Sequence, residues 1–553
     1  MAIPGRNKII MRTTQDYLDA VVAKGAPLPK PGDIECEIME RVRAALVGVN
    51  SMMSKSETKY PLPDHLELMQ IAAVLAAIDP VIRIPCAGTE ADESCDQIGF
   101  YTDSGPYEGV YRIDDDVLCA YVRKYEPAFE PKQIVALKSF LRPLVKRRTP
   151  NENRDLIALQ NGIFNYQTKT LQPFSSDIVF LSKSQIGYNA AAVNPVIMMP
   201  DGLPWDVESW MSDLTDDPGI TNLLWQLIGA CLRPMVHWDR AFWFYSERGN
   251  NGKGTYNQIV RNILGPRACA SVSIAEFAEQ FALTGLIGAQ ADIVDENDVG
   301  AFIETAAALK AAITGDILTI DRKFQDPILF RFHGLMIQGV NGYPKFRDRS
   351  ESFYRRQVVV PFSKCFSGRE RKYIKADYLA RQNVLEYVVK RVLEMDYYEF
   401  EIPSACDAAL ADYKQYNDPV RAYLDEMLPQ FAWDLVPYKF LYDLYKAWFA
   451  STNPRGQVES RTAFIHDIDM ILDTGIYPEW RPTNGLVKTQ HMMDAPEMLI
   501  SDYNLAAWFS RSYHGSDISR RCIPPLATSY RGIRRVQPAA AAVGPDVPEG
   551  LRS

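Results

Sequence analysis

Long apolar runs are missing from this sequence of 553 residues. A membrane-spanning helix needs roughly 18 or more consecutive, mostly apolar residues, and no window of the chain supplies them. The start of the chain, residues 1–8, does not lead into an apolar core with a small-residue cleavage site, as a secretory signal would. We therefore expect a protein that stays in the cytoplasm and contacts no membrane.

Cysteine and histidine are not arranged as metal ligands. The nine cysteines include no CxxC pair, and the closest two, Cys86 and Cys95, have no histidine near them at zinc spacing. This pattern excludes a zinc ribbon. It predicts reduced thiols with structural roles, as expected inside a cell.

An excess of positive charge is also absent. The sequence has 60 Lys and Arg against 69 Asp and Glu, a formal net charge of −9. This balance argues against a protein that coats nucleic acid with its whole surface. It is compatible with local basic patches or a channel lined by basic residues, because the net charge does not show how the charges are distributed.

What is present is a globular composition, 47% hydrophobic and 23% charged, with hydrophobic periodicity that changes along the chain. Apolar residues recur at helical spacing over 37–49 and 66–78, and strand-like runs begin near Gly99. Residues 204–362 alternate helices with short apolar strands, which is typical of an α/β domain. Residues 403–535 return to amphipathic helices. The predicted fold class is multidomain, α/β and α, and the predicted regions are 1–97 (helical), 98–203 (α+β), 204–365 (α/β), 366–535 (helical) and 536–553 (disordered tail).

The strongest motif is a glycine-rich turn between an apolar strand, which starts at Phe242, and a helix that contains Ile259, Val260 and Ile263. Small residues let backbone N–H groups surround phosphate oxygens, and the helix adds its positive N-terminus. Lys253 would neutralise the β- and γ-phosphates of ATP, while a hydroxyl would hold Mg²⁺. The residues predicted to bind nucleotide are Gly249, Asn250, Asn251, Gly252, Lys253, Gly254 and Thr255.

Two positions of this turn depart from a standard phosphate loop. Such a loop has Gly where Glu247 stands and Ser or Thr where Gly254 stands. Thr255, one residue later, is the predicted source of the metal-binding hydroxyl, with a water molecule as the alternative. On its own, the segment could also be a plain glycine turn.

A second apolar run, about forty residues further on, ends in two carboxylates. We predict that Asp295 holds Mg²⁺ through water and that Glu296 polarises the water that attacks the γ-phosphate. A third strand, residues 334–340, ends in Asn341, which could orient that water or sense the γ-phosphate. The alternatives are a solvated acidic turn and an ordinary Asn-Gly turn.

An arginine pair precedes a further strand, residues 358–362. Arg355 or Arg356 could reach the ATP of a neighbouring subunit as an arginine finger, and the spacing to Asn341 slightly favours Arg356. The alternative is a surface pair held by salt bridges.

The order of these motifs resembles a superfamily 3 helicase of the AAA+ class. It is most similar to the phage/plasmid primase–helicase family and the related poxvirus-type nucleoside triphosphatase. The resemblance covers about residues 98–535. The matching motifs are Asn251-Gly252-Lys253, Asp295-Glu296-Asn297, Leu309-Lys310 with Thr314-Gly315-Asp316, the segment 353–362, the upstream segment 161–165, and Asn417-Asp418-Pro419-Val420, which in the family opens a winged-helix-like region.

The resemblance implies a hexameric, ATP-driven DNA helicase of phage or plasmid replication that translocates 3′→5′ and works in the host cytoplasm if it is phage-encoded. It implies ATP and Mg²⁺ as cofactors, and single-stranded or forked DNA, further copies of itself and a separate primase or polymerase as partners.

Residues 317–332 form two alternating runs around a basic tip, which predicts a hairpin. In this class the hairpin enters the central channel, where Arg322 and Lys323 would contact phosphates and Phe324 would stack on a base or brace the loop. A solvent-facing hairpin is the alternative.

Two other basic clusters could serve DNA or simply face solvent. Residues 131–154 carry seven basic residues against one acid, and Arg520, Arg521, Arg531, Arg534 and Arg535 have no acid among them. The aromatic helix before the second cluster is predicted to be core and not a base-stacking platform; its residues are Tyr438, Leu441, Tyr442, Tyr445, Trp448 and Phe449.

A priming centre is not recognisable. The 97 residues ahead of the family-like segment are too few for an archaeo-eukaryotic-type primase domain, and Asp114-Asp115-Asp116 has no histidine near it in sequence. Two alternatives to a dedicated helicase remain open: a primase–helicase with an unrecognised priming centre, and an origin-binding or loader ATPase that does not unwind DNA.

Overall fold

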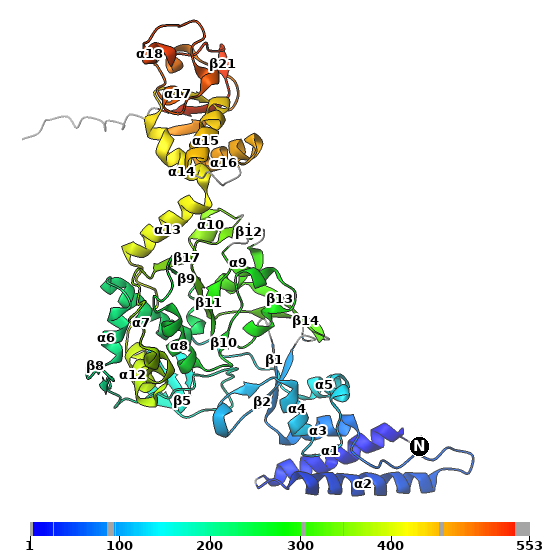
Figure 1. The fold of residues 1–553 in the computed structure, drawn as a ribbon. Helices are drawn as coiled ribbons and strands as arrows, with labels where there is room; N and C mark the ends of the chain where they lie inside the picture. The colour runs from blue at the N-terminus through cyan, green and yellow to red at the C-terminus, as the bar shows by residue number, and fades with distance from the viewer. Residues whose placement is uncertain are drawn as a thin grey trace, which may run out of the picture. The chain divides into compact units, whose positions relative to one another are not determined.

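The computed structural model describes residues 4–25, 27–85, 93, 96–299, 302–303, 306–323, 325–346, 348–452 and 458–536. The chain divides into two compact units, Met1–Leu410 and Ala411–Ser553 (Figure 1). Cys86, Cys95, Phe324 and residues 537–553 of the predicted disordered tail (536–553) lie outside the described residues. No described helix is both long enough and apolar enough to cross a membrane.

The first unit begins with helices and a small antiparallel sheet that share one core. The elements are α1 (Arg6–Lys24), α2 (Pro31–Met52), α3 (Leu68–Ile78), β1 (Val81–Ile84), β2 (Gln97–Tyr101), β3 (Tyr111–Arg112), α4 (Asp115–Val122) and α5 (Ile134–Leu141). In α2 the fully buried Ile34, Ile38, Val42 and Leu46 recur every four residues, which places them on one helix face. The two predicted helices are confirmed. Because α3 packs on α5, this core runs from Ile9 to Val145, across the boundary predicted at residue 97.

A second, larger core contains the rest of the first unit. It includes the antiparallel strands β4 (Leu156–Leu159) and β5 (Gly162–Asn165), and β6 (Thr170–Gln172) pairs with β5. The core continues through α12 (Gln382–Leu393) to Cys406. The chain therefore divides near residue 410 and not at the predicted boundary of 365, because the buried face of α12 packs on the same core as the preceding α/β region.

A five-stranded parallel sheet lies at the centre of this core and confirms the predicted α/β pattern. Its strands, in spatial order, are β10 (Cys269–Ala270), β11 (Ala291–Asn297), β15 (Leu335–Val340), β9 (Ala241–Tyr245) and β17 (Gln357–Pro361). One face of the sheet packs on α12 and on α7 (Pro218–Leu232) and α8 (Lys253–Leu264) (Figure 1). Tyr245 pairs with both Val340 and Pro361, so the carboxyl ends of β15, β9 and β17 are level.

The hairpin predicted between the second and third motifs is also confirmed. It consists of β13 (Ile317–Arg322) and β14 (Gln325–Arg331), paired antiparallel and inserted between α9 (Ala307–Thr314) and β15. Ile317 pairs with Arg331 at the base, and Arg322 pairs with Gln325 next to the tip.

The second unit contains the predicted helices and also a small antiparallel sheet, whereas the hydrophobic pattern of residues 403–535 indicated helices. The helices are α14 (Pro419–Met427), α15 (Tyr438–Thr452) and α16 (Arg461–Asp473). The antiparallel sheet has the order β18 (Leu435–Pro437), β22 (Gly532–Arg535), β19 (Trp480–Pro482). The aromatic side chains of α15 are buried or half-buried in the core of this unit, so the prediction that they are core residues is confirmed.

Candidate functional site

The predicted phosphate loop lies where the strand order of the parallel sheet reverses. After β9 the chain crosses to β10 at one edge and returns strand by strand to β15, and from there it passes to β17 on the far side of β9. In parallel α/β sheets, ligands bind beyond the carboxyl ends of the strands at such a switch point. The turn between β9 and α8 lies at this place, and so do the residues that follow β11 and β15.

The backbone of the turn is specialised. Asn250 and Gly252 have φ angles of 55° and 88°, in the left-handed region. A Cβ atom at Gly252 would also lie 2.7 Å from Leu214 Cδ2, so this position requires glycine. Asn251 is buried; its Nδ2 donates to the Arg248 carbonyl at 2.6 Å and its Oδ1 accepts from the Lys253 amide at 3.2 Å. The amide side chain of Asn251 therefore fixes the turn internally.

A segment after β17 braces the turn from outside. The Phe366 amide donates to the Asn250 carbonyl at 2.7 Å, and Asn250 Nδ2 donates to Ser367 Oγ at 3.2 Å and Glu370 Oε1 at 3.0 Å. Sequence reasoning missed Ser367 and Glu370, since they follow the turn by more than a hundred residues and form no motif with it.

Lys253 is the centre of the site. Its side chain is 5% exposed, and its Nζ donates to the Val340 carbonyl at 2.9 Å and to Asn341 Oδ1 at 2.8 Å. Burial lowers the Lys253 pKa to about 8, while the negative charge of Glu296 acts in the opposite direction. The structure thus brings together Lys253, Asn341 and Glu296, three residues predicted from separate motifs.

Asp295 has partners that the sequence analysis did not predict. It accepts hydrogen bonds from Arg261 Nη1 at 2.9 and 3.1 Å and from Asn257 Nδ2 at 2.7 Å, and Arg261 also donates to the Ile293 carbonyl. Glu296, the next residue, is exposed and has no hydrogen-bond partner among the described residues. Glu296 is therefore the carboxylate of the pair that is available to water or to a ligand.

The face of α8 turned toward Asp295 carries Gly254, Asn257 and Arg261. A Cβ atom at Gly254 would lie 4.0 Å from Asp295 Cγ, whereas Thr255 is rotated by about 100° around the helix. The structure therefore does not bring the Thr255 hydroxyl to Asp295. Among the described residues, no group of three or more His, Cys, Asp or Glu side chains could hold a metal ion, and Mg²⁺ binding at this site stays a prediction.

A buried polar network supports the two strands that carry the site. Gln338 Nε2 donates to Asp292 Oδ2 at 2.7 Å, and Asn297 Nδ2 donates to Gln338 Oε1 and to the Gly339 carbonyl, each at 3.0 Å. Burial raises the Asp292 pKa to about 7. Gly339 permits the close strand approach at this point, because a Cβ there would lie 2.0 Å from the Asp295 carbonyl oxygen. Asn297, the third residue of the acidic motif, therefore holds β11 to β15.

The two arginines lie at the amino end of β17, whereas Lys253 lies beyond the carboxyl end of the neighbouring strand β9. The Arg356 carbonyl accepts from the Ala241 amide at the start of β9, whereas the phosphate loop begins after the end of that strand, about 16 Å away. Arg356 Nη1 donates to the Ser352 carbonyl at 2.6 Å. Arg355 is exposed, and its side chain has no hydrogen-bond or ion-pair partner among the described residues, so the geometry favours Arg355 over Arg356 as a group that could reach another molecule.

The predicted DNA contacts differ in exposure. Lys323 is exposed at the hairpin tip, whereas Arg322 is half-buried and its Nη1 donates to Gln97 Oε1 at 3.3 Å.

The first of the two other basic clusters is largely engaged in ion pairs: Arg147 with Asp96 at 2.8 Å, Arg148 with Asp177 at 3.1 Å, and Lys132 and Lys138 with Glu130 and Asp115. In the C-terminal cluster, Arg520 pairs with Asp517 at 3.7 Å and Arg535 with Asp434 at 3.6 Å. The ion pairs of the first cluster favour its structural interpretation, whereas those of the second involve two of its five arginines.

Comparisons with known families match two parts of the chain. Residues 244–356 match a family described as a family of unknown function (DUF5906), and residues 415–505 match a family described as Poxvirus D5 protein-like. The first range contains the phosphate loop, the acidic pair, Asn341 and both arginines. The second match supports the resemblance to the poxvirus-type proteins in the C-terminal unit.

Solved structures similar to this chain include those of the NrS-1 C-terminal region. One apo structure is 14% identical, covers 80% of this chain and 91% of its own, and gives a TM-score of 0.40. A second is 14% identical over 85% of this chain and 100% of its own, with a TM-score of 0.41. A third is 13% identical over 86% and 99%, with a TM-score of 0.39.

Proposed function

We propose that this chain is an ATP-hydrolysing motor that acts on DNA, a helicase of phage or plasmid replication with a superfamily 3 AAA+ core. The observation that carries the proposal is the environment of Lys253. Its charge is buried at the switch point of a parallel sheet, and among the described residues its ammonium donates to two neutral oxygen atoms, those of Val340 and Asn341. A buried cation that forms no ion pair is costly, and Lys253 forms none among the described residues, so a polyphosphate at this place would be strongly favoured.

Each residue of the site then has a role in phosphoryl transfer. Lys253 neutralises charge on the β- and γ-phosphates, the amides of the glycine turn hold their oxygens, and Asn341 orients the terminal phosphate or the attacking water. Glu296 accepts the proton of that water, since it is the exposed carboxylate of the acidic pair. Mg²⁺ would enter with the nucleotide and use its phosphates together with Glu296 or Asp295, because Mg²⁺ is usually held by substrate phosphates and one or two carboxylates.

The motor is proposed to work as a ring, a hexamer, that moves 3′→5′ on single-stranded DNA. An arginine at the amino end of β17 lies far from the Lys253 of its own chain, so Arg355 would act on the nucleotide of the next subunit. The exposed Lys323 and the neighbouring Arg322 would contact DNA phosphates inside the ring. A separate primase or polymerase would supply the synthesis of new strands.

Forked DNA provides the decisive experiment. The full chain should hydrolyse ATP faster with single-stranded DNA and should separate the fork, while Lys253→Ala should do neither and should keep a folded circular-dichroism spectrum. ATP hydrolysis without strand separation would favour the loader ATPase. Primer synthesis on a single-stranded template would favour the primase–helicase. The ring is tested by the mass of the complex formed with an ATP analogue and forked DNA.

A further inference from the structure

A second lysine lies beside the phosphate loop, in a segment that follows the parallel sheet. Lys375 belongs to α11 (Lys372–Ala376), a short helix that contacts α8. Ile374 of α11 is buried in the same core as the sheet, and the ring centroids of Tyr373 and Tyr378 are 5.2 Å apart. Apolar contacts therefore hold α11 in place, whereas Lys375 is exposed and takes no part in this packing.

The ammonium of Lys375 approaches the first turn of α8. Its Nζ lies 3.5 Å from the position that a Cβ atom at Gly254 would occupy, and Asp295 Cγ lies 4.0 Å from the same position. In a standard phosphate loop this Cβ carries the hydroxyl that binds Mg²⁺, and the metal bridges the β- and γ-phosphates. Lys375 therefore lies on the side of the loop from which a standard site contacts these two phosphates.

Lys375 has no partner within the described part of the chain. Its ammonium makes no hydrogen bond, ion pair or aromatic contact there, and the neighbouring Asp295 is bonded to Arg261 and Asn257 instead. The amino end of a helix carries about half a positive charge, which disfavours a cation beside it. An ammonium held at the start of α8 is therefore stabilised when an anion binds between them.

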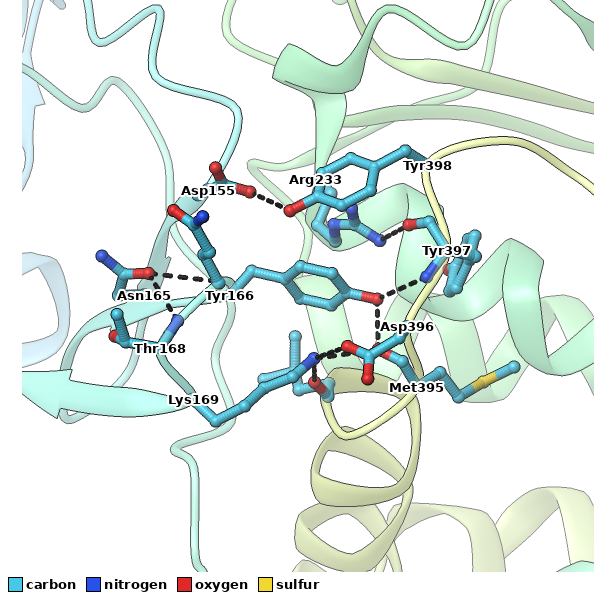
Figure 2. Close-up of polar contacts among 12 residues, drawn as sticks. Asp155, Asn165, Tyr166, Thr168, Lys169, Arg233, Met395, Asp396, Tyr397 and Tyr398 are labelled. Carbon is cyan, nitrogen blue, oxygen red and sulfur yellow. Dashed lines mark hydrogen bonds and ion pairs between the residues drawn. The ribbon is translucent and has the colours of Figure 1, made fainter.

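Two other cations of this unit show how the protein itself can hold such a charge. The guanidinium carbon of the buried Arg233 lies 3.4 Å from the ring centroid of Tyr166, and its Nη1 donates to a backbone carbonyl at 2.9 Å (Figure 2). Lys169 Nζ lies 3.6 Å from the centroid of the same ring and pairs with Asp396 at 2.9 Å (Figure 2). Rings, carbonyls and a carboxylate thus satisfy these two cations. Among the described residues Lys375 contacts no such group, which leaves its ammonium available to a ligand.

We propose that Lys375 is a second cation for the polyphosphate of the nucleotide and contacts its β- and γ-phosphates on the side where Gly254 lacks a hydroxyl. This inference rests on the proposed function, because it assigns a further residue to the same site. Lys253 and Lys375 then neutralise the phosphate charge from two separate elements, α8 and α11. The ammonium of Lys375 is thus the counterpart, in this chain, of the contact that the departure at Gly254 removes from the loop.

The test measures binding of two ligands to the full chain by isothermal titration calorimetry: a non-hydrolysable ATP analogue and inorganic tripolyphosphate. EDTA is present, so that protein groups alone balance the phosphate charge. Lys375→Gln removes the charge and should weaken the binding of both ligands about tenfold, because it removes one hydrogen bond between charged groups. Lys375→Arg keeps the charge and should bind both ligands more tightly than Lys375→Gln does.

Lys372→Gln, a change at another exposed lysine of α11, is the matched control and should bind both ligands like the parent. Since both positions are exposed, both variants should keep the circular-dichroism spectrum of the parent. Parent-like binding by Lys375→Gln would overturn this inference alone, and so would a loss for the ATP analogue without a loss for tripolyphosphate. Absence of binding by the parent, or equal binding by Lys253→Ala, would overturn the proposed function and this inference with it.

Discussion

Nucleotide binding should weaken as the pH rises above about 8, because the pKa of Lys253 is lower in the free protein than in the complex with a phosphate. In the free protein, burial holds the Lys253 pKa at about 8, well below its ordinary value of 10.5. In the complex the phosphate charges favour the protonated form, so the pKa returns to its ordinary value or above. Below pH 8 the lysine is charged in both states. Above pH 8 each binding event must take up one proton.

The size of the effect follows from these two pKa values. One proton per binding event means a tenfold loss of affinity per pH unit between about 8 and 10.5. From pH 7.5 to 9.5 the dissociation constant should therefore rise about 20-fold. Phosphate monoesters titrate near pH 6, so the ligand itself contributes nothing to the slope in this window.

Fluorescence anisotropy of a labelled ATP analogue would measure this dependence. Cys365 also titrates near the loop: its hydrogen bond with Ser367 lowers the thiol pKa, and its Sγ lies 3.7 Å from the Gly249 carbonyl oxygen. The measurement is therefore made in Cys365→Ser. Lys253→Arg is the matched control, since a guanidinium stays charged throughout and should abolish the slope. A flat profile in Cys365→Ser, or an equal slope in Lys253→Arg, would refute the reasoning.

Three further predictions concern the remaining site residues. Glu296→Gln should bind ATP normally and release phosphate about 10²–10⁴-fold more slowly; an unchanged rate would make Glu296 an ordinary surface acid. Arg322→Ala with Lys323→Ala should keep basal ATPase activity and lose stimulation by single-stranded DNA. The slope of log K for DNA binding against log salt concentration should become shallower by about 0.7 per lost phosphate contact. An unchanged slope would mean that DNA binds elsewhere on the protein. Arg355→Ala should lower ATPase about 10³–10⁵-fold, and mixing it with Lys253→Ala should restore part of the activity. Absence of recovery despite confirmed subunit exchange would mean that Arg355 acts within its own chain or supports the fold.

Local features of the fold could be predicted because they depend on residues close together in the sequence. The spacing of apolar residues every four positions predicted α2, and two alternating runs around a basic tip predicted the hairpin β13–β14. The hydrophobic pattern did not indicate the small sheet of the second unit, since its strands are only three or four residues long and carry no measurable alternation. The domain boundary predicted at residue 365 was not found there, because the side chains of α12 pack against the preceding core, whose residues are distant in sequence.

The sequence by itself determined the strand–turn–helix that places Lys253, since a glycine turn, an apolar strand and a helix start are all local properties. Only the tertiary structure decided which side chains meet there. The register of the parallel strands places Asn341 beside the Lys253 ammonium. The orientation of α8 about its axis places Arg261, and not Thr255, beside Asp295. The length of β9 separates Arg355 from the phosphate loop. The spacing of residues along the chain determines which side chains share one face of a helix or strand. The register between strands and the face by which a helix packs determine which other side chains those residues contact.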